Sequence, residues 1–176
     1  MNYAFYESLS WDEANKLLYE FLETEEQELF EMKNELENNG IILDYSFDSI
    51  IALLDLFSKR VNTFPTVVDE SLPWWIKQSD SYRDNLFKFD DASKLLIFIA
   101  AYYLGECFSK QFPDNLKWAT GDIDSPEMNM QVITGFKHSI EMAPITIVKN
   151  LFSRIVKDRN ATKDIRIAIE KWLELI

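Results

Sequence analysis

The residue types that most often carry catalytic or metal-binding chemistry are scarce in this chain. Its 176 residues include one cysteine, one histidine and four glycines. A single cysteine, Cys107, excludes an internal disulfide and a cysteine-cluster metal site. The single His138 has no second histidine with which to share a metal, and the glycines show no phosphate-binding or dinucleotide-binding spacing. The composition therefore predicts neither a metal nor a cofactor.

A long hydrophobic run is also missing. The longest apolar segment, LLIFIAAYYL at residues 95–104, has about half of the roughly 20 residues that a helix needs to cross a bilayer. It predicts a core helix and no membrane association. The first residues, MNYAFYESLSWDE, show no basic region followed by an apolar stretch, so we expect no secretory signal. Together these features predict a cytoplasmic protein.

Basic side chains are few in the first part of the chain. The formal net charge is -12, and residues 1–60 carry 14 acidic against 4 basic side chains, whereas residues 136–176 carry 5 against 8. Nucleic-acid binding requires a concentrated basic surface, so we expect no nucleic-acid partner. The same asymmetry suits attraction of a basic protein. The sequence leaves the oligomeric state open.

The amount of apolar material predicts a folded chain of one domain, residues 1–176. Apolar residues make up 47% of the sequence, enough for a substantial core at this length. Helical periodicity and turn signals predict a mainly α multi-helix bundle of about five to six helices, with a small β-hairpin inserted before the last two. The hairpin strands are expected near residues 116–120 and 128–134.

Local signals place several helix starts. Ser10, followed three residues later by Glu13, is typical of a reciprocal helix cap. Ser46 and either Asp90 or Asp91 are expected to cap the next two long helices. Pro144 suits a first helical position, and Thr162 is expected to cap the last helix.

The segment AAYYLGECFSK, residues 100–110, places small side chains at Ala101, Gly105 and Ser109, four residues apart on one helix face. Glycine inside a helix costs about 1 kcal/mol relative to alanine. We therefore expect another segment to approach this face closely, and Trp118 on the returning chain is the candidate.

Glu106, next to this glycine, has two interpretations. In one, it forms a surface ion pair with Lys110, one turn later. In the other, it is half-buried and accepts hydrogen bonds from a tyrosine hydroxyl or from loop amides after Trp118. The second interpretation makes Tyr102, Glu106 and Trp118 a candidate small-ligand or enzyme pocket.

Two further features favour protein binding. The helix expected from Trp11 to Glu37 carries ten acidic residues, which form an acidic ridge that steers a basic partner. Within this ridge, the candidate partner-binding residues are Glu25, Glu26 and Glu28. Trp74 and Trp75 form the second feature. If their segment is extended, one side chain is buried while its neighbour is free to anchor a partner.

The order of several short segments resembles uncharacterised helical bacterial proteins in which a YLGE-type helix precedes a Trp-bearing hairpin. In chain order these segments are LDYSFDSI, a Pro-Trp connector, AAYYLGECF, LKW, VITGF and APITIV. The similarity covers residues 41–156, and similar small acidic proteins serve as immunity partners in toxin systems. The resemblance implies a bacterial source and assigns no functional residue. We predict a non-catalytic interaction domain, of immunity type, that occludes a basic partner. The alternatives are the ligand pocket above and mimicry of nucleic acid by the acidic ridge.

Overall fold

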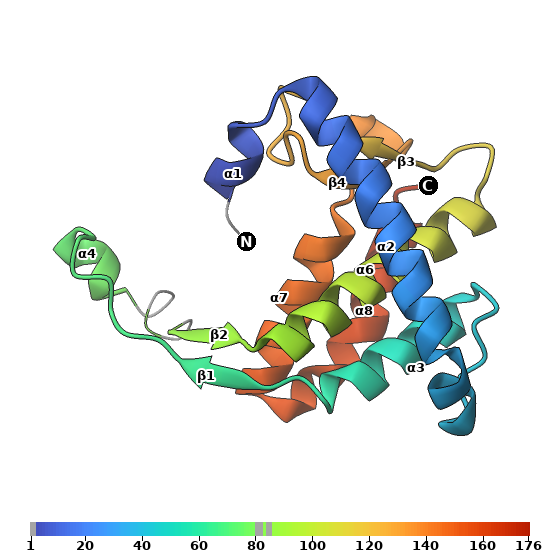
Figure 1. Ribbon diagram of the computed structural model, residues 1–176, viewed down its shortest axis with the longest axis horizontal. Coiled ribbons are helices and arrows are strands. Elements are labelled where there is room, and N and C mark those ends of the chain that lie inside the picture. Colours follow the sequence, from blue (N-terminus) through green and yellow to red (C-terminus); the bar gives the residue numbers. More distant parts are fainter. Residues whose placement is uncertain (1–2, 80–82, 84–85) are drawn as a thin grey trace.

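The computed structural model describes residues 3–79, 83 and 86–176. The chain is mainly helical and contains two small antiparallel hairpins (Figure 1), which confirms the predicted mainly α class. The elements in chain order are α1 (Tyr3–Glu7), α2 (Trp11–Asn38), α3 (Phe47–Ser58), β1 (Thr63–Pro65), α4 (Trp74–Lys77), β2 (Phe87–Phe89), α6 (Asp91–Gln111), β3 (Lys117–Thr120), β4 (Gln131–Thr134), α7 (Pro144–Lys157) and α8 (Asp164–Leu173), with short 3-10 helices at Lys137–Ser139 and Arg159–Lys163.

Most of the helix starts follow from the sequence signals. The Ser10 hydroxyl accepts the Glu13 N–H while the Glu13 carboxylate accepts the Ser10 N–H at 2.8 Å, so the predicted reciprocal cap of α2 is confirmed. The Ser46 and Asp90 side chains cap α3 and α6, and Pro144 occupies the first turn of α7. These bonds satisfy backbone N–H groups that have no partner within the helix.

The prediction for Thr162 is wrong. Residues Arg159–Lys163 form a 3-10 helix, and α8 begins only at Asp164 without a side-chain cap. The Thr162 hydroxyl instead donates to the carbonyl of Arg159 at 3.4 Å. A threonine hydroxyl can bond a nearby carbonyl as readily as it caps a helix, and here the local bond prevails.

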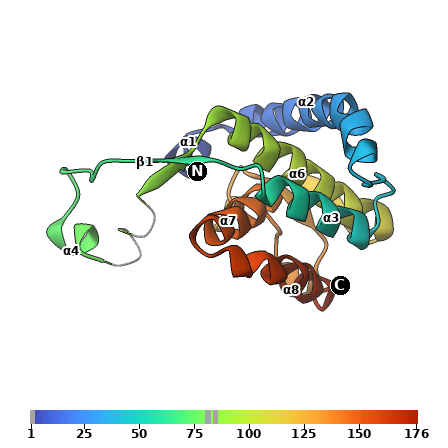
Figure 2. The same cartoon turned by 90° about the horizontal axis from the view of Figure 1, so that it is seen from below.

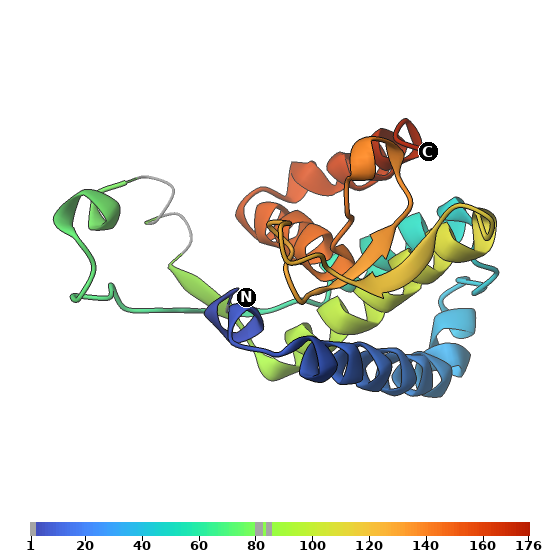
Figure 3. The ribbon, with the colours of Figure 1, turned by 90° about the horizontal axis from the view of Figure 1, so that it is seen from above.

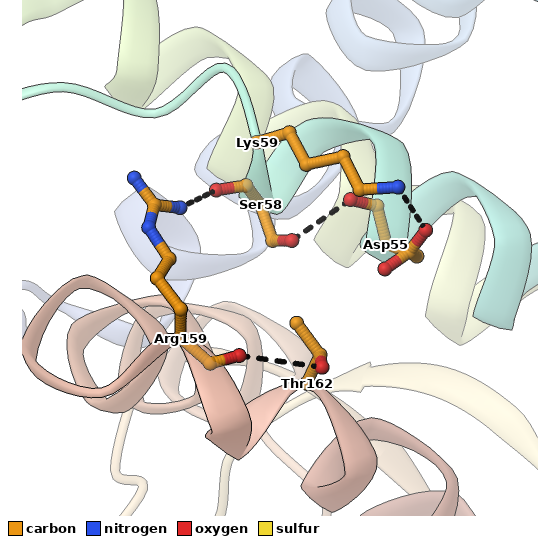
Figure 4. Close-up of polar contacts among 5 residues, drawn as sticks. All are labelled: Asp55, Ser58, Lys59, Arg159 and Thr162. Carbon is orange, nitrogen blue, oxygen red and sulfur yellow. Dashed lines mark hydrogen bonds and ion pairs between the residues drawn. The ribbon is translucent and has the colours of Figure 1, made fainter.

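Arg159 connects this 3-10 helix to the end of α3 (Figure 4). Its Nη1 donates to the carbonyl of Ser58, the last residue of α3, at 2.8 Å. The Ser58 hydroxyl donates to the Asp55 carbonyl at 2.8 Å, so another terminal carbonyl of the helix is also satisfied. A cation at a helix C-terminus is favourable because the helix dipole is negative there. The contact joins segments 101 positions apart in sequence.

Helix α6 is the centre of the fold. It contacts α2, α3 and α7 (Figure 2), and its buried side chains include Tyr103, Cys107 and Phe108. Among the described residues, α6 is the one helix with the length and apolar character of a membrane span, and 61% of that segment is buried within the fold. The predicted core helix is therefore confirmed.

Tyr103 shows how this core accommodates a polar atom. Its ring is fully buried, but its hydroxyl accepts the Tyr45 N–H and bonds the Ser49 hydroxyl, each at 2.8 Å. Burial raises the pKa of the Tyr103 phenol to about 12, so it stays a neutral hydrogen-bonding group. The bonds tie α6 to the start of α3.

The two hairpins differ in how well the sequence predicted them. Strands β3 and β4 pair antiparallel with Trp118 opposite Ile133, which confirms the hairpin expected before the last two helices. The β1–β2 hairpin, with Thr63 opposite Phe89, was not predicted. Together with α4 and the described residues between them, β1 and β2 form what we call the arm. The arm projects away from the helices around α6 (Figure 3).

Candidate functional site

The predicted contact between Gly105 and Trp118 is confirmed. A Cβ atom added to Gly105 would lie 2.0 Å from Cζ2 of the Trp118 indole, a distance that no real side chain occupies. The glycine on α6 therefore allows the indole from β3 to lie directly on the helix. This close approach explains why a residue that weakens an isolated helix stands in the middle of α6.

Each interpretation of Glu106 holds in part: the pair with Lys110 forms and the side chain is largely buried, but its hydrogen-bond donor is the Trp118 indole and not a tyrosine hydroxyl or a loop amide. Its Oε1 accepts a hydrogen bond from Trp118 Nε1 at 2.9 Å, and its Oε2 lies 3.1 Å from Lys110 Nζ. The Glu106 side chain is only 13% exposed, so these two partners offset much of the cost of burying its charge. The Lys110 ammonium also lies 3.5 Å from the centroid of the Tyr45 ring, a cation–π geometry.

Phe21 from α2 completes this cluster. Its ring meets Trp118 edge to face at 5.8 Å and Tyr102 at 6.5 Å between centroids. Burial, reinforced by the negative charges of Glu106 and Glu26, raises the pKa of Tyr102 above its ordinary value. The structure thus brings Tyr102, Glu106 and Trp118 together, as the ligand-pocket hypothesis requires. It also packs Phe21 against two of them and engages both Glu106 oxygens.

The acidic ridge of α2 needs one correction. Glu26 is exposed and Glu28 is half-buried, but Glu25 is buried at 6% exposure. The reason is helical period. Glu25 stands on the same face as the buried Leu18 and Leu29, seven residues after one and four before the other. Glu25 therefore faces the core and is not available to a partner.

The carboxylate of Glu25 is poorly accommodated there. Its Oε2 is buried and finds no hydrogen-bond partner among the described residues. Burial, with a smaller contribution from the negative charge of Glu28, raises the pKa of Glu25 to about 7. Grouping the glutamates by charge alone did not predict that Glu25 is buried, although the apolar periodicity of α2 places it on the buried face.

Trp74 and Trp75 are both exposed, at 66% and 61%. They lie in the short helix α4, not in an extended segment, so the expectation that one is buried while the other is free is wrong. Their rings meet edge to face at 6.1 Å, and no residue of α4 is buried. The sequence also suits a short helix in the region 81–88; half of that range lies outside the described residues, and Phe87–Phe89 is strand.

The single cysteine and the single histidine lie in different environments. Cys107 is fully buried in α6, and burial raises the pKa of its thiol. His138 is exposed in a 3-10 turn with a φ of 60°. Within the described part of the chain, no group of three histidine, cysteine or acidic side chains is placed to hold a metal ion.

The loop between β3 and β4 borders a cavity of about 440 Å³, whose wall includes Asp122, Asp124 and Glu141. The Asp122 N–H donates to both oxygens of the Glu141 carboxylate, each at 3.2 Å. One wall carboxylate is therefore already bonded to the loop backbone.

Comparison of the chain with protein-family models, with curated proteins and with solved structures finds no match. The resemblance to helical immunity-type proteins therefore stays a prediction.

Proposed function

We propose that this chain is a non-catalytic bacterial, cytoplasmic interaction domain that binds a protein partner through the arm. The observation that carries the proposal is the pair of exposed tryptophans, Trp74 and Trp75, on a segment that projects from the helices. Tryptophan is among the residues that most often dominate binding energy at protein interfaces. Val67 and Phe64, at 91% and 47% exposure, extend the apolar surface along the arm.

The construction of the arm supports the same proposal. Strands β1 and β2 have three residues each, and β2 is held to the core by the buried Phe89, whereas no residue of α4 is buried. Burial of the exposed side chains of α4 by a partner would add to the stability of this part of the arm. The large exposed apolar surface is otherwise unfavourable for a monomer.

The charge of the chain supports a basic partner. The net charge of -12 favours rapid association with a positively charged protein, and exposed Glu26 together with Glu28 contributes to that attraction. In an immunity-type role, the bound domain neutralises a basic toxin domain by covering its working surface. No catalytic step by this chain is required.

The experiment compares capture of proteins from a lysate of the source organism by three immobilised forms of the domain. These are the wild type, Trp74→Ala/Trp75→Ala, and the control Trp11→Ala, which removes an indole that is 54% exposed on α2. We expect the wild type and the control to retain one stoichiometric basic protein that is released as salt rises. The arm variant should retain at least about tenfold less.

The ligand-pocket hypothesis makes a different forecast in this experiment. It expects a co-purifying small molecule and no protein, with loss of that molecule on Glu106→Gln. Equal capture by the wild type and the arm variant would contradict the proposed role of the arm.

A further inference from the structure

A second exposed surface lies on α2. Four residues of α2 follow one another at intervals of four, three and four, which places them along one face of the helix. They are Tyr19, Glu23, Glu26 and Phe30. Tyr19 and Phe30 are 71% and 72% exposed, and both glutamates are exposed. We call these four residues the α2 stripe. It is about 16 Å long at a rise of about 1.5 Å per residue.

In the part of the chain that the structure describes, the carboxylates of the stripe lack the basic partners that several other glutamates of α2 have. Glu20 is paired with Lys16, Glu37 with Lys33, and Glu35 with Arg60. Within the described residues, Glu23 and Glu26 form no ion pair. The two unpaired carboxylates stand between the two most exposed aromatic rings of α2. Solvation alone accounts for exposed glutamates, but it does not account for large aromatic side chains at both ends of them.

The side chains of the stripe specify the chemistry of what covers it. Aromatic rings offer apolar surface and also attract Lys and Arg cations over their faces. Carboxylates between the rings attract the same cations and repel phosphate. Residues 1–60 carry a net negative charge, with 14 acidic against 4 basic side chains, so an anionic membrane surface or a nucleic acid is disfavoured. The spacing of four, three and four fits a second helix lying along α2.

We propose that the α2 stripe binds a basic amphipathic helix of the partner protein. Apolar side chains of that helix pack against Tyr19 and Phe30, and its Lys or Arg side chains pair with Glu23 and Glu26. This inference rests on the proposed function, because it names the chemistry of the partner, but it concerns a surface separate from the arm.

The test uses synthetic helices, because the partner protein is unidentified. The probe is a fluorescently labelled amphipathic peptide of leucine and arginine in heptad order, about 14 residues and about 21 Å long as a helix. Two comparison peptides replace every arginine by glutamate or every leucine by glutamine. Anisotropy titrations measure Kd for the full chain at moderate salt.

Three variants separate the stripe from the overall charge. Glu23→Gln/Glu26→Gln removes the two unpaired carboxylates. Glu20→Gln/Glu31→Gln is the matched control, since it removes the same charge from exposed positions about a quarter turn away on the same helix. Tyr19→Ala/Phe30→Ala removes the rings, and circular dichroism verifies that each variant is folded.

We expect the chain to bind the leucine–arginine peptide and neither comparison peptide. The stripe variants should each raise Kd by at least about tenfold, and the control by less than about twofold. An equal loss in the control would show general charge attraction and overturn the proposal, as would unchanged binding by the stripe variants.

The arm variant Trp74→Ala/Trp75→Ala makes the two proposals distinguishable. It should bind the peptide with wild-type Kd while it loses the captured partner. If the stripe variants keep wild-type peptide affinity while the arm variant loses the partner, the proposed function stands and the stripe proposal is wrong.

Discussion

Around α6 the large aromatic side chains are enclosed, whereas the outer part of the arm leaves Phe64, Trp74 and Trp75 exposed to water. Phe108 and Tyr103 are fully buried, while Trp74 and Trp75, whose rings meet edge to face, are both exposed. Both regions are rich in apolar side chains, so composition does not separate them. The difference lies in the neighbours. α6 is covered by α2, α3 and α7, and the arm has a two-stranded hairpin for support. Apolar side chains stabilise the fold in the first region and remain exposed in the outer part of the second.

A large effect on stability is expected at the contact of Gly105 with Trp118. Gly105→Ala places a methyl group where the indole now lies, so the ring must move and its bond to Glu106 is lost. We expect a loss of about 3 kcal/mol in the free energy of unfolding, measured by urea denaturation.

A second substitution tests the cause. Trp118→Leu removes the ring atoms that would clash, so Gly105→Ala should cost much less in that background than in the wild type. Additive losses would show that the glycine is required for another reason.

Burial of the Glu25 carboxylate in the core is energetically unfavourable when the group is charged. With a raised pKa of about 7 in the folded chain and an ordinary value of about 4.3 when unfolded, the folded chain binds the extra proton between these limits. The free energy of unfolding therefore falls as pH rises through this window. Glu25→Met should be more stable than the wild type by about 2 kcal/mol at pH 8, and the gain should shrink as the pH falls from about 7 to about 4.3.

The measurement is denaturant unfolding at pH 4 and pH 8 for the wild type, Glu25→Met and the control Glu31→Met, whose side chain is exposed on the same helix. The control is expected to show little pH-dependent difference from the wild type. A gain for Glu25→Met that is equal at both pH values would indicate better packing and not the removal of a buried charge.

The Tyr103 hydroxyl tests the polar contacts of the core. Tyr103→Phe keeps the ring but leaves the Tyr45 N–H and the Ser49 hydroxyl without this partner. We expect a loss of about 1.5 kcal/mol in the free energy of unfolding. Tyr19→Phe, at an exposed position, is the control and should change stability by less than about 0.5 kcal/mol.

The smallest effect on stability is expected in the arm. Trp74→Ala/Trp75→Ala should change the free energy of unfolding by less than about 0.5 kcal/mol, because no residue of α4 is buried. Thermal denaturation compares this variant with Phe108→Ala, which should cost about 4 kcal/mol. A large loss in the arm variant would show that the tryptophans support the fold, and it would remove the contrast between the two regions.

The sequence predicted best where the signal was local. The reciprocal cap at Ser10 and Glu13 needs only residues three apart, and the apolar run of α6 needs only its own composition. The Gly105–Trp118 contact was predictable because a glycine inside a helix calls for a close neighbour. Each of these inferences used few residues and one physical rule.

Prediction failed where tertiary context decided the outcome. Glu25 was grouped with exposed glutamates by charge, although the period of Leu18 and Leu29 places it on the core side. The β1–β2 hairpin is too short for an alternating pattern to identify. No local rule indicated that both Trp74 and Trp75 would remain exposed, because exposure depends on which elements fail to cover them.

The two ends of the arm lie next to each other. The Asp90 N–H donates to the Asn62 carbonyl at 3.3 Å, and the Asn62 N–H donates to the Ser93 hydroxyl at 2.7 Å, so the chain leaves the helices and returns at one place. An insertion with adjacent ends can change in length or sequence at little cost to the structure that carries it. The arm is thus a replaceable unit. The residues between the two strands can change while the interior around α6 is preserved.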